Sequence, residues 1–150
     1  MNTLDKPDFV MSTYIKTSEA KLWEALTTGS MTRQFFQMEG ELQGDVVEGG
    51  EYSYEVEGVG TILTGTFLDV SPTSRLEMTF IPNWDDKSRI PEIPSRNVYE
   101  IEESEEGCKL TISHFGVTPA LDGVRDGWIR VAARLKTLLE TGEPFRLSAN

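Results

Sequence analysis

His114 is the only histidine of this chain and the first residue whose chemistry stands out. An imidazole can act as a general acid or base near neutral pH, or as a polar anchor for a ligand. Leu110 and Ile112 alternate with it, so strand geometry would turn all three side chains toward the interior. The competing interpretation, which we favour, is a core histidine whose ring nitrogens bind a backbone or hydroxyl group.

Cys108 is the only cysteine and precedes His114 by six residues. At about 3.3 Å per residue, a strand would separate the two by roughly 20 Å. That distance excludes a shared metal site or a Cys–His dyad within the strand. The chain also has no His-Glu-x-x-His pair and no Gly-x-Ser-x-Gly nucleophile elbow. We therefore expect no metal site and no cofactor, and we assign no catalytic residue.

Two other segments carry polar side chains at alternating positions, which strand geometry would turn to one face. These are Tyr52 and Tyr54 in the first segment, and Asn97 and Tyr99 in the second. Apolar walls with a few hydroxyl or amide groups are typical of a small-molecule site. Alternatively, the tyrosine rings pack in the core and their hydroxyls reach the surface. A buried Asn97 would need a water or a ligand oxygen as its partner.

The last segment of the chain is expected to cover these side chains from one side of the sheet. Its apolar residues recur at steps of three and four, which is typical of a helix with one buried face. They are Val124, Trp128, Val131, Ala132, Leu135 and Leu139. The helix is predicted to begin near Asp122 and to end at Gly142. Its only large partner would be a sheet, and a long helix on a curved sheet tends to leave a cavity.

Segments rich in β-branched and aromatic residues, separated by Gly and Pro turns, predict that sheet. They span 9–16, 39–42, 52–57, 61–70, 75–81, 96–102 and 108–115. Two short helices are predicted after the first strand, one capped by Thr17 or Ser18 and the other by Ser30. Gly65 is predicted to mark a bulge or a bend, and residues 82–94, with Trp84, an irregular loop. This is an α+β layout, and its length suits a single domain over residues 1–150.

The net charge of −11 is concentrated in acidic clusters at 39–57 and 100–106. Such clusters repel phosphate backbones, so we expect no nucleic-acid partner. They are interpreted as solvated strand faces and turns, with an acidic docking surface as the alternative. No apolar run reaches about 18 residues, so no membrane insertion is expected. The polar N-terminus and the single cysteine favour a cytoplasmic protein.

Four stretches of the chain, in order, resemble the AHSA-type branch of the START-like (SRPBCC) superfamily. They are Lys16 to Thr27 with Trp-Glu-Ala-Leu-Thr, Gly65 to Leu76, Tyr99 to His114, and the Gly127-Trp128 helix. The resemblance implies a helix-grip fold, as in the birch-pollen allergen: a curved antiparallel sheet around a long C-terminal helix, with a hydrophobic cavity between them. Phe80 departs from the branch, which often has Trp there, and residues 82–94 match no pattern of the family.

The resemblance and the residues together predict binding of a small hydrophobic or amphipathic molecule in this cavity. Members of the superfamily are similar in binding lipids, hormones or polyketides. The residues expected to line the cavity are Tyr52, Tyr54, Met78, Phe80, Asn97, Tyr99, Ile112, His114, Trp128, Val131 and Leu135. One alternative is a co-chaperone-like module that binds a protein partner or forms a homodimer. The other is a cyclase- or hydrolase-type enzyme that uses the polar residues of the cavity.

Overall fold

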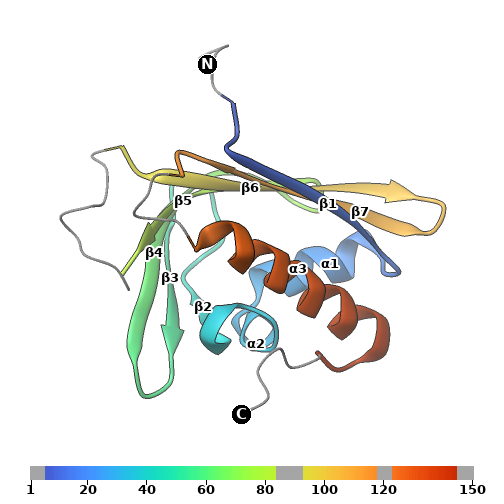
Figure 1. Ribbon diagram of the computed structural model, residues 1–150, viewed down its shortest axis with the longest axis horizontal. Helices are drawn as coiled ribbons and strands as arrows, with labels where there is room; N and C mark the ends of the chain where they lie inside the picture. The colour runs from blue at the N-terminus through green and yellow to red at the C-terminus, as the bar shows by residue number, and fades with distance from the viewer. Residues whose placement is uncertain (1–5, 84–92, 118–122, 145–150) are drawn as a thin grey trace.

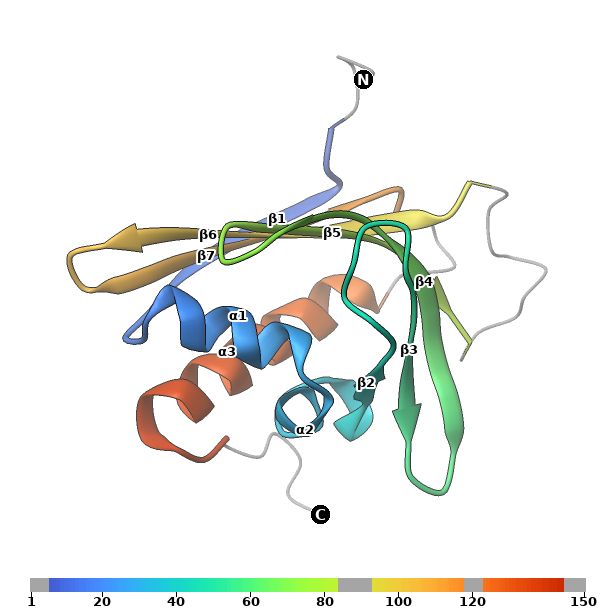
Figure 2. The same ribbon diagram turned by 180° about the vertical axis from the view of Figure 1, so that it is seen from behind.

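A bent antiparallel sheet and a layer of helices make up the fold (Figures 1 and 2). The computed structural model describes residues 6–83, 93–117 and 123–144. The strands are β1 (Phe9–Ile15), β2 (Glu41–Gln43), β3 (Glu51–Val56), β4 (Gly60–Ser71), β5 (Arg75–Pro82), β6 (Ser95–Ser104) and β7 (Gly107–Phe115). The helices are α1 (Glu19–Thr27), α2 (Gly29–Thr32), the 3₁₀ helix η1 (Gln37–Glu39) and α3 (Val124–Thr141).

The strands form one sheet in the order β1-β7-β6-β5-β4-β3-β2. Every neighbouring pair is antiparallel, and β1 forms one edge of the sheet by pairing with β7. The helices all lie on one side of this sheet, with α3 running across it beside α1 and α2 (Figures 1 and 2). This is the helix-grip fold that the sequence predicted.

Glycine at position 65 allows the sheet to bend. Gly65 pairs with Tyr52 of β3, whose ring crosses over it so that the Tyr52 hydroxyl donates to the Thr79 carbonyl at 2.6 Å. A Cβ at Gly65 would overlap both that carbonyl and the tyrosine ring. Beside it, the backbone N–H of Thr66 donates to the Thr79 hydroxyl at 2.8 Å instead of to a strand carbonyl.

The β4–β5 ladder is interrupted at this point, since paired residues resume only at Phe67 and Met78. A further register shift follows between Phe67 and Asp69. As a result the β3–β4 hairpin turns away from the line of the other strands and runs down beside the helices (Figure 1). The bend predicted at Gly65 is confirmed.

Helix α3 buries most of the stripe that its spacing predicted, although Leu139 is only partly buried and Leu138 is buried instead. Val124, Trp128, Val131 and Leu135 are all buried against the sheet and the shorter helices. Gly142 ends the helix in the left-handed conformation, with φ 92°, as predicted. The expected start near Asp122 lies outside the described residues, where α3 begins at Val124.

The opposite end of α3 is tied to strand β1. Lys136 pairs with Glu140 at 2.8 Å, and its ammonium group also donates to the Tyr14 carbonyl. The Glu140 carboxylate accepts a bond from the backbone N–H of Lys16 at 2.9 Å. Two side chains of α3 therefore form hydrogen bonds with backbone groups at the end of the edge strand β1.

The early helices follow the prediction in part. The Ser18 hydroxyl accepts a bond from the backbone N–H of Lys21 at 3.2 Å and so caps α1. The prediction that Ser30 caps the second helix is wrong, because α2 starts at Gly29 and has Thr28 at its cap position. No described helix is both long and apolar enough to cross a membrane. Residues 84–92 of the predicted loop, Trp84 included, lie outside the described residues.

We expect Gly65→Ala to lower the free energy of unfolding by about 3 kcal/mol, because the added methyl group meets backbone that cannot move away freely. Chemical denaturation measures this change. The control is Gly123→Ala, where an added Cβ meets nothing within 4 Å and the loss should stay below about 1 kcal/mol. Equal losses for both variants would contradict the account of the bend.

Candidate functional site

All eleven residues predicted to line a cavity are buried between the sheet and α3. None of them is more than 5% exposed. They come from four strands, β3, β5, β6 and β7, and from α3. The alternation of the strands and the stripe of the helix therefore turn the predicted side chains to the same layer, which we refer to as the interior site.

Trp128 is the point at which the elements of the interior site meet. Its ring lies 6.0 Å from that of Phe80 and 5.8 Å from that of Tyr99, centroid to centroid. Phe36, which follows α2, contributes a further wall that the prediction did not include. Its ring stacks on Tyr54 at 4.0 Å and meets Trp128 edge-on at 6.3 Å. Trp128 therefore contacts Phe80 and Tyr99 as well as Phe36, which in turn stacks on Tyr54.

A buried chain of hydrogen bonds starts at the same indole. The Nε1–H group of Trp128 donates to Nδ1 of His114 at 2.8 Å. The proton of the neutral imidazole must then sit on Nε2, which lies 3.0 Å from Oγ of Ser95. The Ser95 hydroxyl in turn donates to the Phe80 carbonyl at 3.0 Å. Each group in the chain has a partner of the opposite kind.

His114 has no nitrogen left for a substrate in this arrangement. Burial lowers its pKa to about 4, although the charge of Asp8 acts in the opposite direction. The imidazole is therefore neutral at pH 7 and fully bonded within the protein. This geometry favours the interpretation of His114 as a core histidine over that of a general acid or base.

The polar groups of the interior tyrosines differ in their partners. The hydroxyl of Tyr52 binds the Thr79 carbonyl. Those of Tyr54 and Tyr99 have no hydrogen-bond partner among the described residues, although each residue is only 2% exposed. Burial raises the pKa of Tyr99, and negative charges on Tyr54 and Tyr52 would raise it further. All three stay protonated at neutral pH.

Asn97 is the third interior group without a partner. It is 2% exposed and lies between Met78 and His114 on the neighbouring strands. Within the described part of the chain, its side-chain amide makes no hydrogen bond. An amide in this position usually binds an ordered water or a ligand, because leaving it unpaired costs roughly 1–3 kcal/mol.

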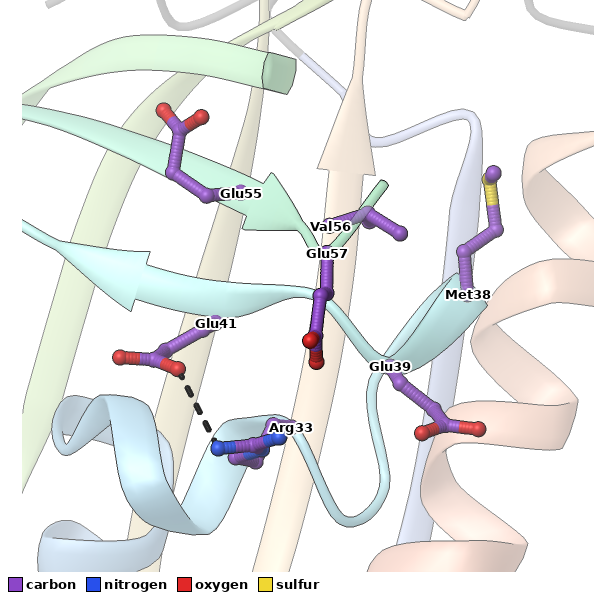
Figure 3. Close-up of a pocket in the computed structure, with 7 residues that line it drawn as sticks. All are labelled: Arg33, Met38, Glu39, Glu41, Glu55, Val56 and Glu57. Atoms are coloured by element: carbon purple, nitrogen blue, oxygen red, sulfur yellow. Dashed lines mark ion pairs between the residues drawn. The ribbon is translucent and has the colours of Figure 1, made fainter. Parts of the chain in front are cut away.

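An open pocket of about 580 Å³ lies near the end of β3 (Figure 3). Its lining residues are Arg33, Met38, Glu39, Glu41, Glu55, Val56 and Glu57. The sequence indicated an acidic cluster here but no pocket, because α2 and η1 supply part of the wall.

The charges of this acidic pocket are partly engaged with one another. Arg33 pairs with Glu41 at 3.6 Å, and the Thr61 hydroxyl contacts the Glu55 carboxylate at 2.8 Å. Four carboxylates against one guanidinium make the pocket unfavourable for anions. No group of three or more His, Cys, Asp or Glu side chains in the described residues could hold a metal ion.

We expect the single histidine to remain neutral in the folded protein down to about pH 4. The unfolded chain takes up this proton near pH 6.5, so folding stability is complete above that pH and falls as the pH drops toward 4. The loss attributable to His114 is about 3 kcal/mol, and it is absent in His114→Gln.

Nitrogen chemical shifts of the imidazole test this directly, since no second histidine interferes. The shifts should report the Nε2–H tautomer and no titration above about pH 5. A transition near pH 6.5, or a proton on Nδ1, would contradict the hydrogen-bond chain.

Solved structures of other proteins share this fold. Protein MLL2253 of Mesorhizobium loti is 21% identical, with a TM-score of 0.73 over 87% of this chain and 95% of that one. The Aha1 dimer of Colwellia psychrerythraea is 19% identical, with a TM-score of 0.71 over 89% and 96%. DynU16, a protein of the dynemicin biosynthetic locus, is 20% identical, with a TM-score of 0.73 over 90% and 48%.

None of the curated proteins matches the chain. The family model described as "Activator of Hsp90 ATPase homolog 1-like protein" matches residues 16–140. The matched span runs from the end of β1 to the last turn of α3 and so contains the whole of the interior site. The chain therefore belongs to the family of Activator of Hsp90 ATPase homolog 1-like proteins, a branch of the START-like superfamily.

Proposed function

We propose that this protein, acting as a single domain over residues 1–150, binds a small hydrophobic or amphipathic molecule in the interior site. The observation that carries the proposal is that Tyr54, Asn97 and Tyr99 are each only 2% exposed, while their side-chain polar groups bond to no other described residue and are not among the fully enclosed atoms. An interior rarely keeps such groups unless water or a ligand satisfies them.

The walls around these groups suit an apolar ligand. Met78, Ile112, Val131 and Leu135 offer aliphatic surface, and each methylene group that a ligand buries there contributes about 0.8 kcal/mol. The three polar groups would fix the orientation of the ligand. DynU16 of a biosynthetic locus has the same fold, which is compatible with a ligand of low molecular weight.

We expect at least one compound in a panel of fatty alcohols, fatty acids, sterols and aromatic phenols to raise the melting temperature in a saturable way. A ligand at about 100 times its Kd stabilises the fold by about 2.7 kcal/mol. Thermal unfolding monitored by circular dichroism measures the effect. No saturable shift across the panel would contradict the proposal.

Two variants locate the binding. Val131→Phe adds volume at a position 2% exposed in the interior and should reduce the ligand-induced shift, whatever its own effect on stability. Val10→Ser changes a side chain that is 54% exposed on β1 and should leave the shift unaltered. The reverse result would assign binding to the surface.

Protein interaction is a second candidate function, and strand β1 favours it. Among the described strands it has a neighbour on one side only, and it exposes Val10 and Tyr14 by 54% and 53%. Exposed edge strands can pair with a second copy. One structure with this fold is the Aha1 dimer.

On this second proposal we expect a concentration-dependent homodimer that Tyr14→Arg weakens at least tenfold. Sedimentation equilibrium measures the dissociation constant. Val59→Arg, at an exposed hairpin position away from β1, is the matched control and should dimerise normally. A monomer at all concentrations would contradict this second function and would have no bearing on the proposal of ligand binding.

A further inference from the structure

The interior of the protein contains no ionised side chain among the described residues. Its buried polar residues are Thr32, Ser95, Asn97, Ser113 and His114, and no Asp, Glu, Lys or Arg is buried with them. Burial keeps His114 neutral by lowering its pKa to about 4, and keeps Tyr54 neutral by raising its pKa. A charged ligand would therefore find no opposite charge there.

The protein itself already uses most of the interior hydrogen-bonding groups. Trp128, His114 and Ser95 bind one another in a chain that ends on the Phe80 carbonyl. Tyr52 binds Thr79. The Ser113 hydroxyl alternates with His114 along β7 and so lies on the other face of the sheet. On the face toward α3, the groups still available to a ligand among the described residues are two hydroxyls and one amide, and both kinds of group can donate and accept.

These available groups lie in the same buried layer, around one aromatic cluster. Tyr99 and Asn97 are two residues apart on the same face of β6, and both side chains are buried. Tyr54 joins the same cluster through Phe36, whose ring meets that of Trp128 edge-on at 6.3 Å. The Tyr54 ring stacks on Phe36, and Tyr99 meets Trp128 edge-on, so the available groups are surrounded by aromatic surface.

We infer that the ligand of the interior site is an uncharged, ring-containing molecule whose polar groups bind the hydroxyls of Tyr54 and Tyr99. This inference rests on the proposed function and names its ligand class. Carboxylates, phosphates and amines are excluded, because an ion moved into an interior without a counter-charge loses its hydration and gains no compensating pair. Fatty acids would accordingly be poor ligands although their chains are apolar.

The test compares ligands that differ only in charge. Naphthamide and naphthoate share a skeleton and a planar polar group, and decanol and decanoate form a second pair. We expect isothermal titration calorimetry at pH 7.5 to give the uncharged member of the naphthyl pair an affinity at least about 100-fold higher than its carboxylate. The uncharged decyl compound should also bind better than decanoate, but more weakly than naphthamide.

Three variants identify the groups that the ligand contacts. Tyr99→Phe and Tyr54→Phe each remove one hydroxyl and keep the ring, so naphthamide affinity should fall about tenfold in each. Tyr14→Phe removes a hydroxyl from the exposed face of β1 and should leave the affinity unchanged. Unchanged affinity in both interior variants would overturn the assignment of these residues.

The outcomes separate this inference from the proposed function. Equal or tighter binding of the carboxylates, with Val131→Phe still weakening it, would overturn the ligand class and leave interior binding in place. Failure of all four compounds would also overturn the ligand class. The proposed function would fall only if the whole hydrophobic panel produced no saturable shift.

Discussion

The hydrogen bond from the Trp128 indole to Nδ1 of His114 fixes how the long helix sits on the sheet. It leads through Ser95 to the Phe80 carbonyl and so joins α3 to three adjacent strands, β7, β6 and β5. Dispersion contacts alone would let the helix slide along an apolar surface, because they have no direction. A buried chain in which each donor meets an acceptor has one favourable geometry, since misaligned polar groups would remain unsatisfied.

The bend at Gly65 gives this helix a curved surface to lie on. The Tyr52 ring occupies the space beside Gly65 that a side chain at this position would take. Its hydroxyl donates to the Thr79 carbonyl of β5 at the point where the β4–β5 ladder is interrupted. Beyond it the β3–β4 hairpin turns toward the helices and carries Tyr54 to the ring of Phe36. The anchored helix and the bent sheet together enclose the layer that contains Tyr54, Asn97 and Tyr99, whose polar groups bond to no other described residue.

Periodicity predicted this layer well, because it depends on local geometry. A period of two placed Asn97, Tyr99 and His114 on one face, and the spacing of the closing helix placed Trp128 opposite them. Periodicity could not predict that Trp128 would bind His114, since that contact depends on how the last helix is docked. It also missed the stacking of Phe36 on Tyr54, which joins a segment after α2 to β3. Ser30 failed as a predicted cap because α2 already starts at Gly29, so that Ser30 lies inside its first turn.

The charge on the surface and the lack of charge in the interior both disfavour an anionic ligand. The protein carries a net charge of −11, its described interior holds no ionised residue, and the acidic pocket near Arg33 lies on the surface. An anion approaching the protein is repelled by this field over about 8 Å at physiological ionic strength. An anion that reached the interior would find neutral tyrosines and a neutral histidine. Surface repulsion weakens with added salt whereas the cost of interior burial does not, so the two barriers act through separate physical terms.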